Sequence, residues 1–352
     1  MKRFFVFLFF ANFLYALPFL SRKFNLSCVE CHIAYSKPSY FGEIVRENLY
    51  LPPNTNPRIQ TLDAKGDKKA YIQRDLPVSG RFRTIMGLVS SEGKFRGNTS
   101  AYLTLYSSTN LSGNSSFFLS LEVGKDSVLL RYATLSVKLP ISSSLTFGKT
   151  DMSEFFLRRS WRIAYQDFLP YDFAGLYGMG ASLRLSPYMW FGVLDVEKGK
   201  FFARAGYNSR FVSFGVFTVP YGEFYMGDSY VLGHRHGLDF RVRFGPFDLT
   251  TSTILGFDQK LGEFSFDKPS FIAGYSSLDL TFGYNFFFSI LYNYIGSKYE
   301  EYQRRYHKSL ITFTFGHYPL RNLKVGFEFG YNTAKRYPSE GSYGGLTLDW
   351  AF

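Results

Sequence analysis

The sequence has very few cysteines and histidines. Its 352 residues include two cysteines and five histidines, and both cysteines, Cys28 and Cys31, lie near the amino end. Between residues 17 and 76 the only imidazole is that of His32, which excludes a four-ligand zinc site in this segment. The chain also lacks the alternating strand and helix patterns in which a thioredoxin-like redox pair is found.

Long apolar runs are absent after the first sixteen residues, so no later segment approaches the roughly 20 apolar residues of a membrane helix. Residues 1–16 themselves combine Lys2 and Arg3 with an apolar run over 4–14 and a small residue, Ala16. This order of parts is typical of a secretory signal peptide, and the run is too short to span a bilayer. We therefore expect an exported chain cleaved after residue 16.

Charge of one sign is not gathered anywhere, although the formal net charge is +12. The basic residues are scattered over short segments, and export makes nucleic acid an improbable partner, so we expect none. Aromatic residues, in contrast, make up 20% of the chain, with 41 Phe and 27 Tyr. Outer-membrane barrels place such residues in girdles at both membrane interfaces, in contact with lipid.

The two cysteines form the motif Cys28-Val29-Glu30-Cys31-His32. In this motif the two sulfurs bind a c-type haem through thioethers and the imidazole holds the iron. Cys28 and Cys31 are therefore the predicted attachment residues, and His32 is the predicted proximal ligand of one covalent haem c. A redox pair, half of a zinc site and a structural disulfide are the alternatives.

The composition divides the exported chain into two parts. Residues 17–76 form the predicted haem segment and linker, with a short helix over 41–48 and a polar stretch without periodicity over 52–75. Residues 77–352 form the predicted barrel, because from Val78 onward the apolar residues recur at every second position.

The alternation is clearest near the carboxy end, where Leu323, Val325 and Phe327 are separated by Lys324 and Gly326. Such a strand has one face for lipid and one for a polar interior. About sixteen segments share this pattern, an even number as expected for a single-chain bacterial barrel. They cover residues 78–90, 98–107, 116–123, 128–138, 141–148, 177–186, 188–196, 200–207, 210–218, 236–244, 247–256, 271–281, 284–296, 309–317, 323–333 and 344–352.

The connections between these segments alternate in length. Those after even-numbered segments are mostly tight, whereas those after odd-numbered segments include all the long ones, at 149–176, 219–235, 257–270, 297–308 and 334–343. Short periplasmic turns and long outer loops are the rule for these barrels. The predicted fold class is therefore all-β: an antiparallel transmembrane β-barrel of about sixteen strands in the bacterial outer membrane, its lumen plugged by the small haem segment. A soluble β-sandwich is the alternative.

The order of signal, haem motif and barrel, together with Pro38, Phe41-Gly42, Arg46 and Tyr50, resembles the fused monohaem cytochrome-porin family of iron-oxidising bacteria. The resemblance implies electron transfer from an extracellular donor, typically Fe(II), through the haem to a soluble periplasmic cytochrome. It also implies Fe(II) oxidase activity.

The sixth ligand of the haem iron stays open. His234, His236 and His317 fall in the lipid-facing phase of their strands, and His307 lies in a predicted loop. The remaining methionine candidates are Met152, Met189 and Met226, and an open position is the further alternative, as in a haem enzyme acting on a small oxidant.

Arginines recur in the predicted inward phase of the wall and in the loop over 149–176. They include Arg158, Arg159 and Arg162 in the loop and Arg81, Arg83, Arg184, Arg204, Arg241 and Arg243 in the wall. Guanidinium groups pair with carboxylates, so these residues either face the haem propionates or line a water-filled pore. As a group they favour anions, and no outer loop is acidic enough to collect Fe(II). The second functional hypothesis is accordingly an anion-preferring porin whose haem segment gates or senses.

Overall fold

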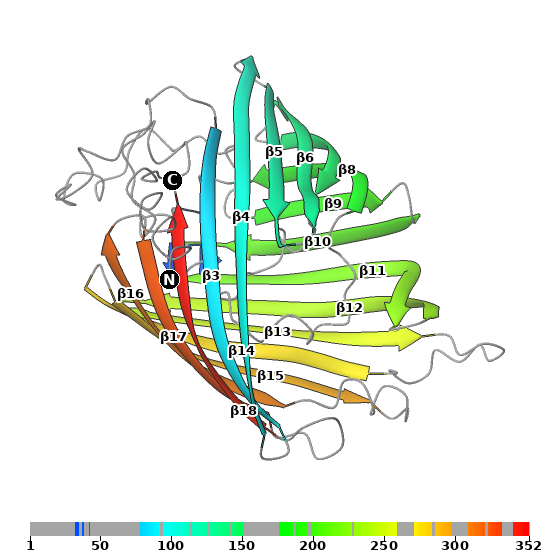
Figure 1. The fold of residues 1–352 in the computed structure, drawn as a ribbon. Coiled ribbons are helices and arrows are strands. Elements are labelled where there is room, and N and C mark those ends of the chain that lie inside the picture. Colours follow the sequence, from blue (N-terminus) through cyan, green and yellow to red (C-terminus); the bar gives the residue numbers. More distant parts are fainter. Residues whose placement is uncertain are drawn as a thin grey trace.

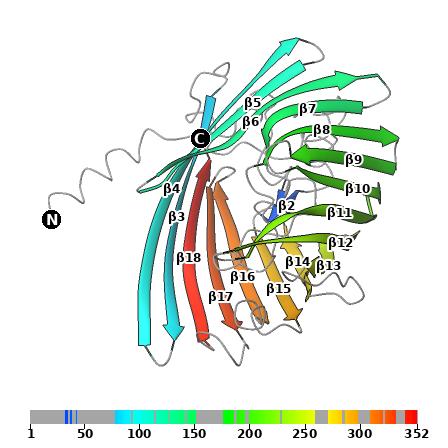
Figure 2. The ribbon, with the colours of Figure 1, turned by 90° about the vertical axis from the view of Figure 1, so that its right-hand side faces the viewer.

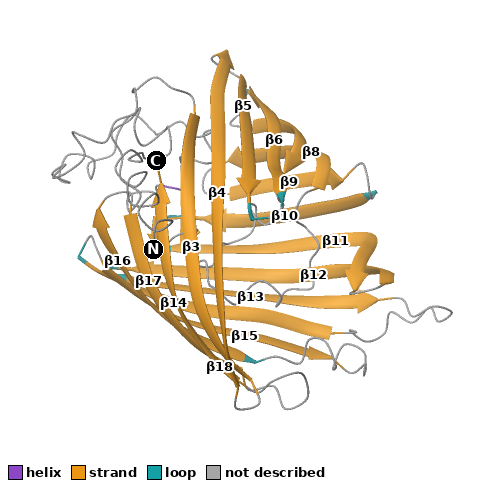
Figure 3. Ribbon diagram, viewed as in Figure 1, coloured by secondary structure: helices purple, strands orange, loops and turns teal. Residues whose placement is uncertain are grey.

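A computed structural model of the chain describes the barrel strands and a few residues of the amino-terminal segment. The described residues are 32–34, 37–38, 42, 78–91, 94–112, 115–125, 127–140, 143–150, 176–185, 188–195, 199–226, 229–258, 271–283, 286–297, 309–320, 323–332 and 341–351. Almost all of them are in strands (Figure 3). No helix within these residues is long and apolar enough to cross a membrane.

Two short strands precede the long ones, and all are labelled in chain order (Figure 1). Their bounds are β1 His32–Ala34, β2 Lys37–Pro38, β3 Val78–Ser91, β4 Lys94–Ser112, β5 Ser115–Val123, β6 Val128–Leu139, β7 Ser143–Thr150, β8 Leu176–Leu185, β9 Tyr188–Asp195, β10 Lys200–Asn208, β11 Val212–Met226, β12 Ser229–Phe244, β13 Phe247–Asp258, β14 Phe271–Phe282, β15 Phe286–Ser297, β16 Leu310–Leu320, β17 Leu323–Asn332 and β18 Gly341–Ala351.

Strands β3 to β18 form one closed antiparallel barrel of sixteen strands. Each strand pairs with the next in the chain, and β18 closes the ring by pairing with β3 over Ala351↔Arg81 to Tyr343↔Val89. Figure 2 shows the ring after a quarter turn. Closure leaves no unpaired edge, which is what a sheet in a bilayer requires. The predicted all-β barrel is therefore confirmed.

The connections also follow the expected alternation. Those after the even-numbered barrel strands span two or three residues each, so this side is the short-turn end of the barrel. The other side, the long-loop end, carries the connections over 151–175, 259–270, 298–309 and 333–340. Gly245 and Gly283 lie in short turns and have φ of 54° and 60°, a conformation that a side chain would strain.

One predicted loop is wrong. The segment over 219–235 is not a loop but the continuation of the β11–β12 hairpin, which pairs as far as Met226↔Ser229. The register shifts between Val219 and Gly222, and Pro220 lies within this irregularity. A proline has no N–H for the ladder and is tolerated at a bulge, so the strand resumes after it.

The two faces of the wall differ as the alternation predicts. On β17 the outward Phe327 is 52% exposed, whereas the inward Lys324 is 5% exposed. Most large apolar side chains that are exposed point outward, among them Leu238, Phe313 and Leu346. A continuous apolar outer face belongs in lipid, so the fold supports localisation in the bacterial outer membrane.

Aromatic rings lie over glycines on the inner face of the wall. Phe287 is the cross-strand partner of Gly316, and a Cβ built at Gly316 would overlap the Phe287 ring. The same arrangement holds for Phe217 over Gly237, Phe271 over Gly256 and Tyr343 over Gly330. Covering a strand glycine with a neighbouring ring fixes the register and buries the exposed backbone.

Candidate functional site

The predicted haem attachment residues are only partly described. Cys28 and Cys31 lie outside the described residues, and His32 is described as the first residue of β1. β1 pairs with β2 in the register His32↔Pro38 and Ala34↔Lys37, and it contacts the barrel strand β14. Figure 2 shows this hairpin within the ring of strands. The structure thus brings the histidine of the motif close to the inner wall.

The inner face of β14 is apolar at one end and polar at the other. Phe271, Ala273 and Tyr275 are buried, and they are followed by the buried Ser277 and Asp279. The hydroxyl of Ser277 donates a hydrogen bond to the Asp279 carboxylate over 2.8 Å, and the hydroxyl of Ser289 donates another to the same carboxylate. The inner face of β14 therefore combines an apolar surface with a carboxylate held by two hydroxyl groups.

The wall arginines whose side chains are described point inward, as predicted, and they lie next to aspartates of the wall itself. Arg204 on β10 donates to both oxygens of Asp239 on β12, over 2.7 and 2.5 Å. It reaches across β11 at Gly215, where a Cβ would overlap the guanidinium. Both partners are almost fully buried, so the pair is shielded from water and held in one geometry.

Two further arginine groups are arranged in the same way. Arg241 donates to both oxygens of Asp248 over 2.6 to 3.0 Å, and Arg243 lies 3.8 Å from the same carboxylate. Where β18 pairs with β3, Arg81 forms an ion pair with Asp349, and Nε of Arg83 lies 3.5 Å from the same carboxylate. The arginines alone predict a positive lumen, but these carboxylates offset their charge.

The aspartate partners were missed by sequence reasoning, although a signal was present. Asp239 and Asp349 occupy the inward phase of strands that also carry or adjoin inward arginines, and Asp248 faces Arg243 across the β12–β13 turn. Strand alternation together with hairpin register would have paired them. Arg184 lies in β8 but its side chain is outside the described part, as are Arg158, Arg159 and Arg162.

The histidines considered as sixth ligand lie on the outer face where they are described. His234 and His236 contact each other, with 2.8 Å between Nδ1 and Nε2, and His234 stacks on Phe257. His317 stacks on Phe286 at the short-turn end, with ring centroids 4.1 Å apart. These three imidazoles therefore do not face the lumen.

Among the methionine candidates, Met226 ends β11 at the long-loop end and Met189 is half-buried in β9. Met152 and His307 lie outside the described residues. Nothing described brings a methionine to His32. Within the described part of the chain, no group of three or more His, Cys, Asp or Glu is placed to hold a metal ion.

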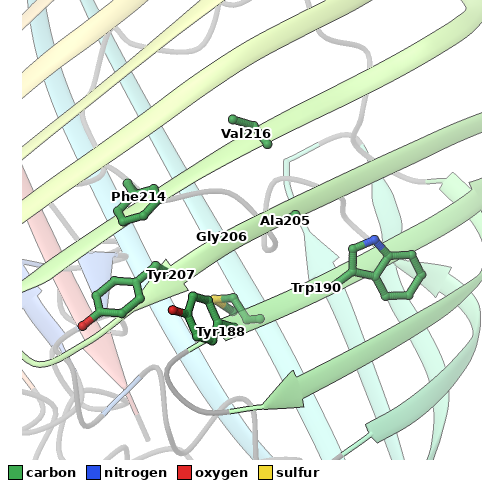
Figure 4. A pocket seen from close by; sticks show the side chains of 8 residues that line it. Tyr188, Trp190, Ala205, Gly206, Tyr207, Phe214 and Val216 are labelled. Atoms are coloured by element: carbon green, nitrogen blue, oxygen red, sulfur yellow. The ribbon is translucent and has the colours of Figure 1, made fainter.

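A groove of about 410 Å³ lies on the outer face near the short-turn end, over β9, β10 and β11 (Figure 4). Its floor is formed by Ala205 and Gly206, and aromatic side chains form its rim. Tyr207 stacks on Phe214 with centroids 5.4 Å apart and meets Tyr188 edge-on at 5.8 Å. The lining of the groove has no carboxylate, imidazole, thiol or amine, and its aromatic rim is typical of an interfacial girdle in lipid.

Comparisons with known proteins show the fold alone. No protein-family model and no curated protein matches the chain. The chain is similar to the solved structure of OmpT of Vibrio cholerae in its trimer form, with a TM-score of 0.58 and 9% identity over 78% of this chain and 98% of that one.

Two further solved porins give the same result. Salmonella typhi OmpF, solved with daunomycin, has a TM-score of 0.58 and 12% identity over 78% of this chain and 97% of its own. The anion-selective porin from Comamonas acidovorans has a TM-score of 0.58 and 12% identity over 78% of this chain and 98% of its own. The chain therefore has the barrel fold of outer-membrane porins.

Proposed function

We propose that the chain is an outer-membrane electron-transfer protein, in which one haem c bound to Cys28 and Cys31 lies within a porin-type barrel. Electrons from an extracellular donor would reach the haem and pass to a soluble periplasmic cytochrome. The observation that supports this proposal is that β1, the strand that begins at His32, contacts the barrel strand β14.

The residues present fit a covalent haem. Two thiols and an imidazole in this spacing are the donor set of c-type attachment. The strand that β1 contacts, β14, carries the buried apolar side chains Phe271, Ala273 and Tyr275. A bound haem would supply one-electron chemistry at its iron, and the protein supplies placement and electrostatics. His32 would hold the iron on one side.

Burial of the inner wall supports a filled lumen. Arg241, Asp279, Asn293 and Thr312 are inward side chains with no exposed area, whereas the wall of an open sixteen-stranded porin faces water. We propose that residues 17–76 fill the lumen against β10–β18. A filled lumen favours electron transfer over solute passage. The division of the chain at residues 16 and 76 stays a prediction.

Fe(II) is the proposed donor because of the family resemblance. The test is stopped-flow absorbance of the purified full chain in detergent, mixed with Fe(II). We expect the absorbance bands of reduced haem to appear rapidly after mixing. Reduction by dithionite but not by Fe(II) would remove the iron oxidase activity and leave another donor. A Cys28→Ala/Cys31→Ala chain without covalent haem is the matched control.

A porin is the second candidate, and the solved neighbours favour it over the haem reading, because all three compared structures are outer-membrane porins or proteins of that fold. In this case the barrel would pass solutes and the amino-terminal segment would gate it. Planar-bilayer conductance separates the candidates. Porin-sized steps in the full chain support the channel, whereas small steps that grow when residues 17–76 are deleted support the filled lumen.

A further inference from the structure

The outer face of the barrel carries a pair of imidazoles in contact. His234 and His236 are two residues apart on β12, so both point outward, and Nδ1 of His234 lies 2.8 Å from Nε2 of His236. The centroids of the two rings are 4.9 Å apart, and the ring planes are inclined to each other by 58°. The porin fold and the proposed haem leave this pair without a role.

Neighbouring strands hold both rings in place. Thr218 on β11 is the cross-strand partner of His236, and its hydroxyl lies 2.9 Å from His236 Nδ1. Phe257 on β13 is the partner of His234 and stacks on it at 4.6 Å, with the planes 12° apart. The same Phe257 meets His236 edge-on at 6.0 Å. The two nitrogens are therefore brought together by three strands.

The separation of the nitrogens suits a shared metal ion. Imidazole nitrogens lie about 2.0–2.1 Å from a metal ion that they bind. When the angle nitrogen–metal–nitrogen is a right angle, the two nitrogens are therefore about 2.8–3.0 Å apart. A tetrahedral ion such as Zn²⁺ would hold them about 3.4 Å apart. Square-planar coordination by nitrogen is the preference of Cu²⁺. The hydroxyl of Thr218 on the other nitrogen of His236 is the kind of partner that orients a ligating imidazole.

The position of the pair gives it access to the outside. On β12 the outward residues nearer the short-turn end are Leu238, Phe240 and Phe244, all exposed apolar side chains that face lipid. His236 and His234 follow these toward the long-loop end, where the membrane gives way to water. Arg235 lies between them in sequence but points to the lumen side and is fully buried. Water can therefore complete the coordination.

We propose that His234 and His236 form a two-histidine site for Cu²⁺ on the outer rim of the barrel, with Thr218 as a positioning residue. Both imidazoles bind in their neutral form: the hydrogen bond between Nδ1 of His234 and Nε2 of His236 is replaced by two bonds to the ion, and its proton moves through water to the other nitrogen of the same ring. The site needs no haem and does not depend on the proposed electron transfer.

The test is Cu²⁺ titration of the full chain in detergent, followed by electron paramagnetic resonance of the copper. One square-planar Cu²⁺ with two nitrogen couplings is expected. His234→Gln or His236→Gln is expected to weaken binding at least about tenfold, and Thr218→Val about tenfold with both nitrogen couplings retained. His317→Gln is the matched control, because that imidazole is also outward and stacked on an aromatic ring but lies on β16, four strands away from the pair.

Two results would overturn the proposal. One is wild-type copper affinity in the His234→Gln/His236→Gln double variant, and the other is an equal loss in His317→Gln. Gel mobility before and after heating checks that each variant forms the barrel. If the variants fail to fold, the wild-type spectrum decides alone, because a copper signal without two nitrogen couplings contradicts the site.

Discussion

The walls over β10–β18 and over β4–β7 enclose the same lumen but have different inner faces. On the first, inward polar side chains such as Thr250, Ser289 and Thr312 are buried. Each of these three hydroxyl groups also takes part in a hydrogen bond with another side chain of the wall. On the second, Thr104 and Ser136 are half-buried, whereas Ser120 and Thr134 are buried. The difference teaches that fully buried polar side chains are more frequent on the wall that includes β14, the strand that β1 contacts.

The same contrast holds for charge and for glycine. The pairs Arg204–Asp239 and Arg241–Asp248 both lie in the β10–β13 part, and the four glycines covered by aromatic rings all lie between β11 and β18. Buried polar groups are costly unless they are fully paired. We infer that the β10–β18 wall is built to be covered.

The largest expected effect on this comparison comes from breaking a buried ion pair. Arg204→Met leaves the Asp239 carboxylate buried without its bidentate donor, and we expect a loss of about 3–5 kcal/mol in the free energy of unfolding. Urea unfolding in lipid vesicles, followed by tryptophan fluorescence, measures it. Arg210→Met is the control, because Arg210 is exposed. Equal stability of the two variants would contradict a covered β10–β18 wall.

A somewhat smaller loss is expected when an aromatic ring is displaced from its glycine. Gly316→Ala places a Cβ where the Phe287 ring now lies, and we expect a cost of about 1–3 kcal/mol from the overpacking. Gly97→Ala on β4 is the matched control, because a Cβ there meets Leu88 at an ordinary 3.8 Å. The same unfolding assay applies. If both variants lose equal stability, the ring-over-glycine packing is not what distinguishes the walls.

Cysteine labelling would sharpen the comparison directly. Thr312→Cys on β16 and Ser136→Cys on β6 both point inward, but the first position is fully buried and the second is half-buried. We expect a water-soluble maleimide to react about tenfold more slowly at residue 312 because that site must open first. The unmodified chain reports any reaction at Cys28 and Cys31. Labelling at equal rates would show that water reaches both walls.

The smallest expected effect is the loss of one buried hydroxyl. Tyr343 donates to Glu328 over 2.8 Å and lies 3.0 Å from the Thr312 hydroxyl. Tyr343→Phe removes both contacts and is expected to cost about 1 kcal/mol in the unfolding assay. Tyr331→Phe, on the outward face of β17, serves as the control. A variant as stable as the control would mean that this hydroxyl contributes nothing to the covered wall.

Much of the fold was predictable because a barrel strand has a short repeat. Leu323, Val325 and Phe327 alternate with polar or small residues, and each such run became one strand in the predicted place. Strand ends were less predictable. Pro220 reads as a stop in the sequence, but the cross-strand register carries β11 past it to Met226. Pairing across strands, which no local pattern contains, decided that boundary.

The candidate site divides in the same way. The sequence by itself determined the two faces of the wall, because alternation is a local property of the chain, and its motif at Cys28, Cys31 and His32 predicts the haem. Only the tertiary structure decided that Arg204 meets Asp239 and that His234 and His236 share Thr218 and Phe257 as neighbours. These contacts join different strands, and closure of the barrel sets which side chains lie opposite one another.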